Sequence, residues 1–230
     1  MLTLDNAVIA QGDFEMHANL TLEAGRKYAV IGPSGAGKST LLNAVCGFVT
    51  LSVGRLLWQG QDITDAPPGA RKMTMLFQDN NLFPHLTVAQ NVGLGIRPDM
   101  RLSAADRDQI EGALARVGLD GYADTRPGNL SGGQQSRAAL ARVLVQAHPL
   151  VLLDEPFAAL GPALRNEMLD LVSDLVTETG ASLLMVTHAP EDVRRISDEV
   201  IFVEGGRANA PQAAAGLMEN PPPELRAYLG

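Results

Sequence analysis

The residues best suited to chemistry lie between Tyr28 and Leu42, where glycines, a lysine and three hydroxyl residues follow a short apolar run. Gly32, Gly37, Lys38 and Ser39 complete the pattern G-x-x-x-x-G-K-[ST]. Glycines let the backbone curl so that N–H groups face phosphate oxygens, and the helix that follows adds its positive end. The lysine can reach the β- and γ-phosphates and the serine hydroxyl can ligate Mg²⁺. We expect a nucleotide site made by Gly32, Pro33, Ser34, Gly35, Ala36, Gly37, Lys38, Ser39 and Thr40.

A pair of carboxylates follows the apolar run Leu150–Leu153. Acids often end strands only to stay solvated, but ligands bind beyond the carboxyl ends of parallel strands, where the phosphate loop also lies. We therefore expect Asp154 to hold Mg²⁺ and Glu155 to act as the general base that polarises the attacking water.

The pentapeptide Leu130–Gln134 reads Leu-Ser-Gly-Gly-Gln. Ser131 suits a helix N-cap, and Gly132 and Gly133 let a phosphate approach the positive helix end; Gln134 completes this expected nucleotide-binding set. Taken alone, the segment also fits a glycine-rich helix cap. One triphosphate does not need two helix ends of one chain, so a head-to-tail dimer in which this end completes the partner's site is the economical arrangement.

The elements that must position these residues follow from periodicity. Alternation over Phe14–Leu22 predicts a strand with one buried face, and the continuous apolar run Tyr28–Ile31 predicts a buried parallel strand. Further strands are expected at Arg55–Gly60, Met73–Phe77, Leu150–Leu153, Ser182–Thr187 and Glu199–Glu204.

Helical character is expected from about Asp79 to Gln146. Within it, Ser103 and Asp106 form a capping-box pattern, and another helix should begin near Gly132. Pro162 suits the first position of a helix that Gly180 ends.

The whole-chain properties limit the function classes. A net charge of −8 without a Lys/Arg run argues against a nucleic-acid partner. The single cysteine, Cys46, permits no internal disulfide and should be a buried, inert thiol. We expect no secretory signal, and no apolar run is long enough to cross a bilayer.

The phosphate loop, the Leu-Ser-Gly-Gly-Gln segment and Leu-Leu-Asp-Glu-Pro, in that order, resemble the ATP-binding subunit of an ABC transporter. The resemblance implies an α/β fold of the P-loop NTPase type, with a mainly parallel core sheet, an antiparallel β subdomain and an inserted helical subdomain. It also implies one nucleotide-binding domain over 1–230, with its core at 1–78 and 147–230 and the helical subdomain at about 79–146.

The same resemblance assigns roles to two residues that would otherwise read as an ordinary strand end and a surface histidine. Gln78 matches the glutamine that senses Mg²⁺ and water, and His188 matches the switch histidine that contacts the γ-phosphate. Two features depart from the family pattern. Gly161 stands where an aspartate is usual, and Val8–Gly12 offers no aromatic residue for adenine, while Phe14 falls within the alternating strand.

A finer resemblance over Met75–Ile96 is to the ATPase subunit of bacterial thiamine importers. Much of that stretch also resembles importers of ferric iron, polyamines, sulfate or molybdate. A soluble, non-transport ABC ATPase and a P-loop kinase are the rival classes; the first usually carries coiled-coil inserts or a second ATPase domain, and the second has no role for the pentapeptide.

The expected partners and place in the cell also follow from the resemblance. They are a second copy with two shared ATP sites, an integral membrane permease gripped through Phe77–Leu86 and, indirectly, a periplasmic binding protein. The apolar residues of that stretch fit packing of the helical insert equally well. The chain would then sit peripherally on the cytoplasmic face of the inner membrane.

Overall fold

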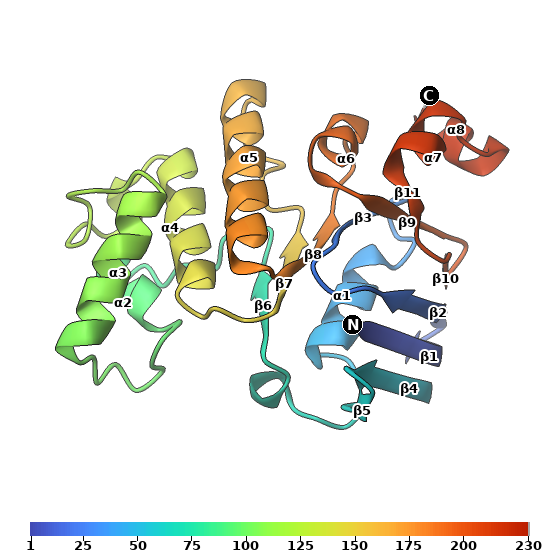
Figure 1. The fold of residues 1–230 in the computed structure, drawn as a ribbon, viewed down its shortest axis with the longest axis horizontal. Helices are drawn as coiled ribbons and strands as arrows, with labels where there is room; N and C mark the ends of the chain where they lie inside the picture. The colour runs from blue at the N-terminus through green and yellow to red at the C-terminus, as the bar shows by residue number, and fades with distance from the viewer. Residues whose placement is uncertain (230) are drawn as a thin grey trace.

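A computed structural model describes residues 1–229 of the chain. Its N-terminal part is an antiparallel sheet, ordered β5-β4-β1-β2 (Figure 1). The strands are β1 (Leu2–Gln11), β2 (Phe14–Leu22), β4 (Val53–Trp58) and β5 (Gln61–Asp62). The alternation predicted for Phe14–Leu22 is confirmed, because β2 buries every second residue and pairs antiparallel with β1.

The second half of the sheet is parallel, in the order β9-β3-β8-β7-β6. Its strands are β3 (Lys27–Ile31), β6 (Met73–Leu76), β7 (Leu150–Asp154), β8 (Ser182–Val186) and β9 (Glu199–Glu204). The short β10 (Arg207–Ala208) joins this half to β2, and β11 (Gln212–Ala213) pairs with β9. The expected fold class, a mainly parallel core with an antiparallel β part and inserted helices, is confirmed.

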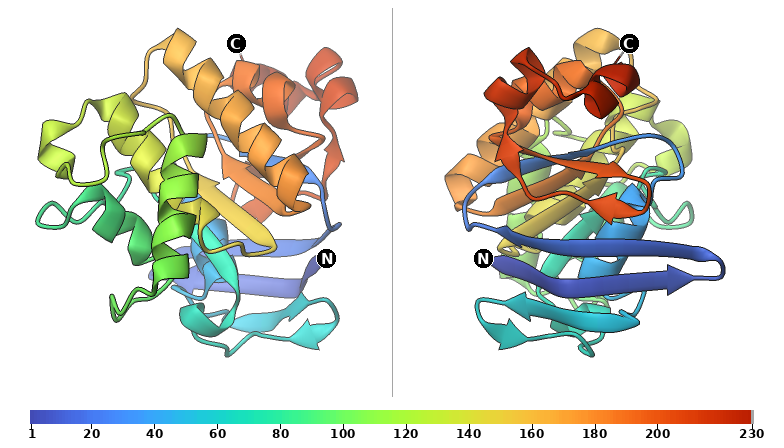
Figure 2. Two further views of the ribbon diagram at one scale, coloured as in Figure 1. Left: turned by 60° about the vertical axis from the view of Figure 1, so that its left-hand side comes forward. Right: turned by 90° about the vertical axis from the view of Figure 1, so that its right-hand side faces the viewer.

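The parallel strands are buried on both faces, which explains their continuous apolar sequence. In β7, Leu150 and Leu152 face the core that contains α1 (Lys38–Cys46), whereas Val151 and Leu153 face the helical layer. Because side chains alternate along a strand, each strand contributes to two cores at once. The phosphate-loop helix α1 is thereby packed between the two halves of the sheet (Figure 2).

Between β6 and β7 the regular structure is helical: α2 (Val88–Gly93), α3 (Ala104–Arg116), the 3-10 turn η2 (Pro127–Asn129) and α4 (Gly132–Leu144). Capping boxes begin α2, α3 and α4, including the predicted one at Ser103 and Asp106. The prediction of helix from Asp79 is wrong for residues 79–87. Asn80 and Asn81 have positive φ there, and the capping box at Thr87 starts the first helix only at Val88.

Four further helices pack on the parallel sheet: α5 (Pro162–Thr179), α6 (Pro190–Ile196), α7 (Ala214–Glu219) and α8 (Pro223–Leu229). Helix α5 shares a core with α4, whereas α6, α7 and α8 pack with β3 and β9. A 3-10 turn, η1 (Pro68–Ala70), precedes β6. Pro162 stands in the first turn of α5 and Gly180 is its left-handed C-cap, as predicted. Within residues 1–229, none of the helices combines the length and the apolar character that a membrane span needs.

Candidate functional site

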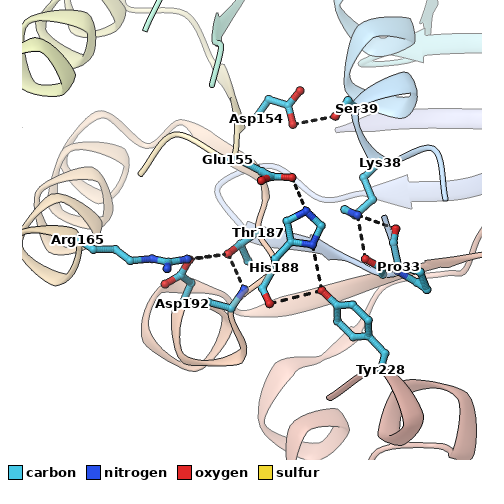
Figure 3. A network of polar contacts seen from close by, with 12 residues as sticks. Pro33, Lys38, Ser39, Asp154, Glu155, Arg165, Thr187, His188, Asp192 and Tyr228 are labelled. Carbon is cyan, nitrogen blue, oxygen red and sulfur yellow. Dashed lines mark hydrogen bonds and ion pairs between the residues drawn. The ribbon is translucent and has the colours of Figure 1, made fainter. Parts of the chain in front are cut away.

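The phosphate loop lies between the end of β3 and the start of α1, at the carboxyl edge of the parallel strands (Figure 3). The backbone turns through three glycines with positive φ: Gly32 at 150°, Gly35 at 77° and Gly37 at 105°. A Cβ on Gly32 would stand 2.0 Å from the Val203 carbonyl oxygen, so only glycine fits. The loop borders an open cavity of about 470 Å³, and Gly35 faces open space.

Lys38 is buried beneath this loop. Its Nζ donates hydrogen bonds to the carbonyl oxygens of Gly32 (2.8 Å) and Pro33 (2.9 Å). Burial lowers the pKa of Lys38, while the charges of Glu155 and Asp154 act in the opposite direction. The ammonium therefore lies at the floor of the cavity, held by carbonyl dipoles that an anion would replace.

Asp154 is brought to the loop by the end of β7. Its Oδ1 accepts a hydrogen bond from the Ser39 hydroxyl at 3.0 Å. Burial raises the pKa of this carboxyl and the charge of Glu155 adds to the rise, whereas the Ser39 hydrogen bond and Lys38 oppose it. A desolvated carboxylate is stabilised by a nearby cation. The Asp154 and Ser39 oxygens are ligands of the kind that Mg²⁺ binds together with phosphate oxygens and water.

Glu155 turns away from the line of β7 because its backbone is left-handed, with φ of 47°. Its N–H donates to the Val186 carbonyl on β8, and its Oε1 lies 2.5 Å from Nε2 of His188. A left-handed non-glycine residue costs about 1–2 kcal/mol, and such strain is concentrated at functional sites. The structure thus brings together two of the three predicted catalytic residues.

A network missed by the sequence analysis anchors the loop that carries His188. Thr187 donates to Oδ2 of the buried Asp192 at 2.5 Å and accepts from the Ala189 N–H. Arg165 of α5 donates to the same carboxylate oxygen, also at 2.5 Å. The acid lies five residues beyond the threonine, on the first turn of α6, and that spacing gave no recognisable signal.

The pentapeptide residues do not line the phosphate-loop cavity of their own chain. Ser131 caps α4, because its hydroxyl oxygen accepts a hydrogen bond from the Gln134 N–H. In turn, the Ser131 N–H donates to Oε1 of Gln134. Gly132 is exposed, and a Cβ on it would meet nothing within 4 Å, whereas a Cβ on Gly133 would stand 2.4 Å from Leu164 Cδ2 of α5. Only the first glycine offers an open approach, because a side chain on the second would have to displace the end of Leu164.

Gln78 is also apart from this cavity. It is exposed two residues beyond β6 and is not among the residues that line the cavity. Exposed phenylalanines lie near it along the chain and in space: Phe83 and Phe48 are 43% and 54% exposed, and the Phe48 ring lies 5.8 Å from that of Phe77, tilted by 52°. Phe48 was not singled out in the sequence because it follows α1, far along the chain from the others.

An aromatic residue does lie at the cavity, although Val8–Gly12 contains none. Phe14, the first residue of β2, lines it together with Gln11. A Cβ on Gly37 would be 2.8 Å from the Phe14 ring. The strand alternation hid this role, because Phe14 is only half-buried and its ring reaches across to the loop.

The arrangement suits phosphoryl transfer to water. A glycine-rich loop and a lysine can hold a phosphate chain, and a hydroxyl and a carboxylate stand ready for a metal. A second carboxylate and a histidine follow on adjacent strands. In the described residues, no group of three or more His, Cys, Asp or Glu could hold a metal by itself.

Comparisons with known proteins agree with this geometry. Residues 16–158 match the family model described as ABC transporter. The chain is 60% identical over 230 residues, all of both chains, to the thiamine import ATP-binding protein ThiQ of Cereibacter sphaeroides. It is 56% identical, again over all of both chains, to ThiQ of Ruegeria sp. (strain TM1040).

Solved structures give the same fold. A dimeric, post-hydrolysis structure of the ATP-binding cassette MJ0796 bound to ADP and Pi aligns with a TM-score of 0.81 and 28% identity. It covers 93% of this chain and 99% of that one. CbiO1 from Clostridium perfringens, part of the ABC transporter complex cbiONQ, aligns with a TM-score of 0.84 and 29% identity, covering 97% and 92%.

Proposed function

Because this chain belongs to the ABC transporter family, we propose that it is the subunit that binds and hydrolyses ATP to power a bacterial importer of thiamine or its phosphates. The thiamine assignment is supported by relatives of that printed function at 56–60% identity over the whole chain. Importers of ferric iron, polyamines, sulfate or molybdate are the alternative cargo classes.

The observation that carries the ATPase proposal is the placement of Ser39, Asp154, Glu155 and His188 around one phosphate loop. Gly32–Thr40 would hold the phosphates, with Lys38 leaving its two carbonyl partners for the β- and γ-phosphates. Glu155 would accept a proton from a water molecule whose oxygen bonds to the γ-phosphorus, while the bond to the bridging oxygen breaks and ADP leaves.

The residues present fit Mg²⁺. Ser39 and Asp154 would hold it, with Gln78 reaching it when the loop after β6 moves toward the cavity. When bound, the ion supplies charge neutralisation on the β- and γ-phosphates. The Ser39 hydroxyl, now a donor to Asp154, would rotate to offer a lone pair.

We propose a homodimer with two shared ATP sites. The exposed end of α4, at Ser131 and Gly132, lies outside the cavity of its own chain, so it is free to complete the partner's site. Gln134 would keep that end rigid through the capping box, and Gly133 would hold α4 close to α5.

The exposed Phe83 and the Phe48–Phe77 pair support contact of the Phe77–Leu86 region with an integral membrane permease. Through that permease the chain would respond to a periplasmic binding protein, from a peripheral position on the cytoplasmic face of the inner membrane. We propose one nucleotide-binding domain over 1–230, with its core at 1–78 and 147–230 and its helical subdomain at about 79–146. The last residue, 230, lies outside the described residues.

The test is reconstitution with the permease in vesicles that contain the binding protein. ATP hydrolysis should rise with thiamine and not with sulfate, molybdate, ferric iron or polyamines. Stimulation by one of the other cargoes would move the assignment to that importer class. A chain that hydrolyses ATP at the same rate with and without permease would favour a non-transport ATPase.

Two variants separate the roles of the acids. Glu155→Gln should bind ATP and lose roughly 10²–10⁴-fold in turnover, because only proton acceptance is removed. Asp154→Ala should instead weaken the dependence of ATP binding on Mg²⁺. Near-normal turnover of the Glu155→Gln assembly would contradict the general-base role.

A further inference from the structure

The C-terminal helix α8 packs against the side of the site that carries the switch histidine. Leu225 of α8 is completely buried in a cluster that includes Ile31 at the end of β3 and Phe202 of β9. Tyr228 packs on this cluster, with its ring 6.5 Å from that of Phe202. The last turn of α8 is therefore fixed beside the root of the phosphate loop.

From this position the Tyr228 hydroxyl reaches His188. It lies 3.4 Å from Nδ1 of the imidazole and 3.5 Å from the His188 carbonyl oxygen (Figure 3). Burial raises the pKa of Tyr228, so the hydroxyl keeps its proton and remains a donor over the working pH range. The other ring nitrogen, Nε2, faces Oε1 of Glu155.

The two contacts together determine the tautomer of a neutral His188. A carboxylate only accepts hydrogen bonds, so the nitrogen 2.5 Å from Glu155 must carry the hydrogen. Nδ1 is then a bare acceptor 3.4 Å from the Tyr228 hydroxyl, whose single hydrogen has Nδ1 and the His188 carbonyl oxygen, at 3.5 Å, as its two acceptors. The proton on one imidazole nitrogen is set by the hydrogen bond that the other nitrogen makes.

We propose that Tyr228 is a positioning residue, which holds His188 as the Nε2–H tautomer and keeps Nε2 turned toward the phosphate-loop cavity. This rests on the proposed function, in which Nε2–H leaves Glu155 and donates to a γ-phosphate oxygen of ATP. The Nδ1–H tautomer would present a lone pair to that anion and repel it. The Tyr228 hydroxyl also contacts the backbone of Gly32 at the start of the phosphate loop, and the proposed role is the one exerted through His188.

The first test uses the nucleotide-free protein and does not depend on catalysis. The chain has four histidines, so ¹⁵N NMR of the imidazole nitrogens is tractable, and His188→Gln identifies the signals of His188. At alkaline pH, where histidine rings are neutral, wild type should show Nε2–H for His188. Tyr228→Phe, which keeps the ring and its packing, should move the Nδ1 resonance toward that of a nitrogen without a hydrogen bond, while Glu155 still keeps the hydrogen on Nε2.

The matched control is Tyr122→Phe, which removes a hydroxyl from an exposed tyrosine between α3 and α4. It should leave the His188 nitrogen shifts unchanged. Identical His188 shifts in wild type and Tyr228→Phe would overturn the proposal. Unchanged thermal unfolding of Tyr228→Phe would show that α8 has stayed folded. Leu225→Ala, which removes the buried anchor of α8, should move the same His188 signals.

The second test is kinetic, in the assembled transporter. Loss of one neutral hydrogen bond should lower kcat about 3- to 10-fold in Tyr228→Phe, with KM for ATP unchanged. A raised KM with wild-type kcat, or no change in either, would contradict a positioning role in hydrolysis. If wild-type assemblies hydrolyse no ATP, the proposed function fails, while the NMR comparison still decides the contact.

Discussion

In the nucleotide-free site, the proposed general base Glu155 is engaged by His188. Oε1 of the glutamate is occupied by Nε2 of the histidine at 2.5 Å. While Nε2 donates to it, this oxygen is a weaker base toward a water molecule, and a γ-phosphate is the natural alternative acceptor for the N–H. The arrival of ATP would therefore both recruit the histidine and free the base.

Phe14 is the residue whose role changes most between the sequence and the structure. Because its ring borders the cavity beside Gly37, we expect it to stack on the adenine. Base–aromatic stacking contributes about 1–3 kcal/mol, so Phe14→Ala should weaken ATP binding roughly 10-fold or more. Phe48→Ala, another exposed phenylalanine, is the control; equal affinities in equilibrium titrations of both variants would exclude stacking by Phe14.

The buried thiol of Cys46 gives a pH dependence of stability. Burial raises its pKa from 9.0 to about 12, so between these values the folded chain holds a proton that the unfolded chain has lost. Stability must then fall as pH rises above about 9, by up to about 1.4 kcal/mol per pH unit. Urea unfolding at pH 8 and pH 10 should show a smaller loss for Cys46→Ala than for wild type. The same loss in both proteins would show that the thiol titrates normally.

At the scale of elements, the start of α5 is an uncapped helix end. Gly161 is its N-cap, makes no side-chain cap, and a Cβ there would meet nothing within 4 Å. Gly161→Asp should stabilise the chain by about 0.5 kcal/mol through capping and the helix dipole. That corresponds to a rise in Tm of about 1–2 °C, absent in Gly161→Ala.

The same substitution tests communication between the two sites, since an aspartate is usual here in the family. If its absence weakens that communication, Gly161→Asp should raise the ATPase rate and its cooperativity. Changed Tm with unchanged kinetics would mean that the glycine affects only the helix start.

The end of the phosphate-loop helix α1 depends on Arg71. This buried guanidinium donates to the carbonyl oxygens of Ala44 and Val45 in the last turn, and to those of Thr64 and Ala66. Arg71→Met should leave several carbonyls unpaired and lower the free energy of unfolding by about 3 kcal/mol. Chemical denaturation measures this, and the exposed Arg107→Met on α3 should cost little; similar losses in both would contradict the capping role.

At the scale of the whole molecule, the sequence predicted those parts of the fold and the site that are formed by residues contiguous in the chain. The apolar run of β3, the glycine turn and the start of α1 are contiguous, so their order predicted the loop directly. The same holds for the acids that end β7. The prediction of a helix at residues 79–87 was wrong, because Asn80 and Asn81 adopt left-handed backbone conformations that form a turn there.

Contacts between segments distant in the chain could not be predicted. Arg165 meets Asp192 across 27 positions, and Tyr228 meets His188 across 40. Neither pair has a spacing that indicates proximity, because the fold of β8, α6 and α8 creates it. The proposal that the pentapeptide works on a second chain rests on the same kind of information: α4 is in the helical layer, away from α1 (Figure 1).

If each ATP site is divided between two chains, mixed dimers of two defective variants should contain one intact site. Lys38→Ala removes the lysine of its own phosphate loop, and Ser131→Arg blocks only the α4 end. Each homodimer then has both sites damaged, but a dimer of one Lys38→Ala and one Ser131→Arg chain collects both lesions in one site and leaves the other intact. Differently tagged, co-purified chains should therefore bind one ATP per dimer in equilibrium binding measurements. Mixed dimers that bind no more ATP than either homodimer would contradict the shared site and place the pentapeptide's role within its own chain.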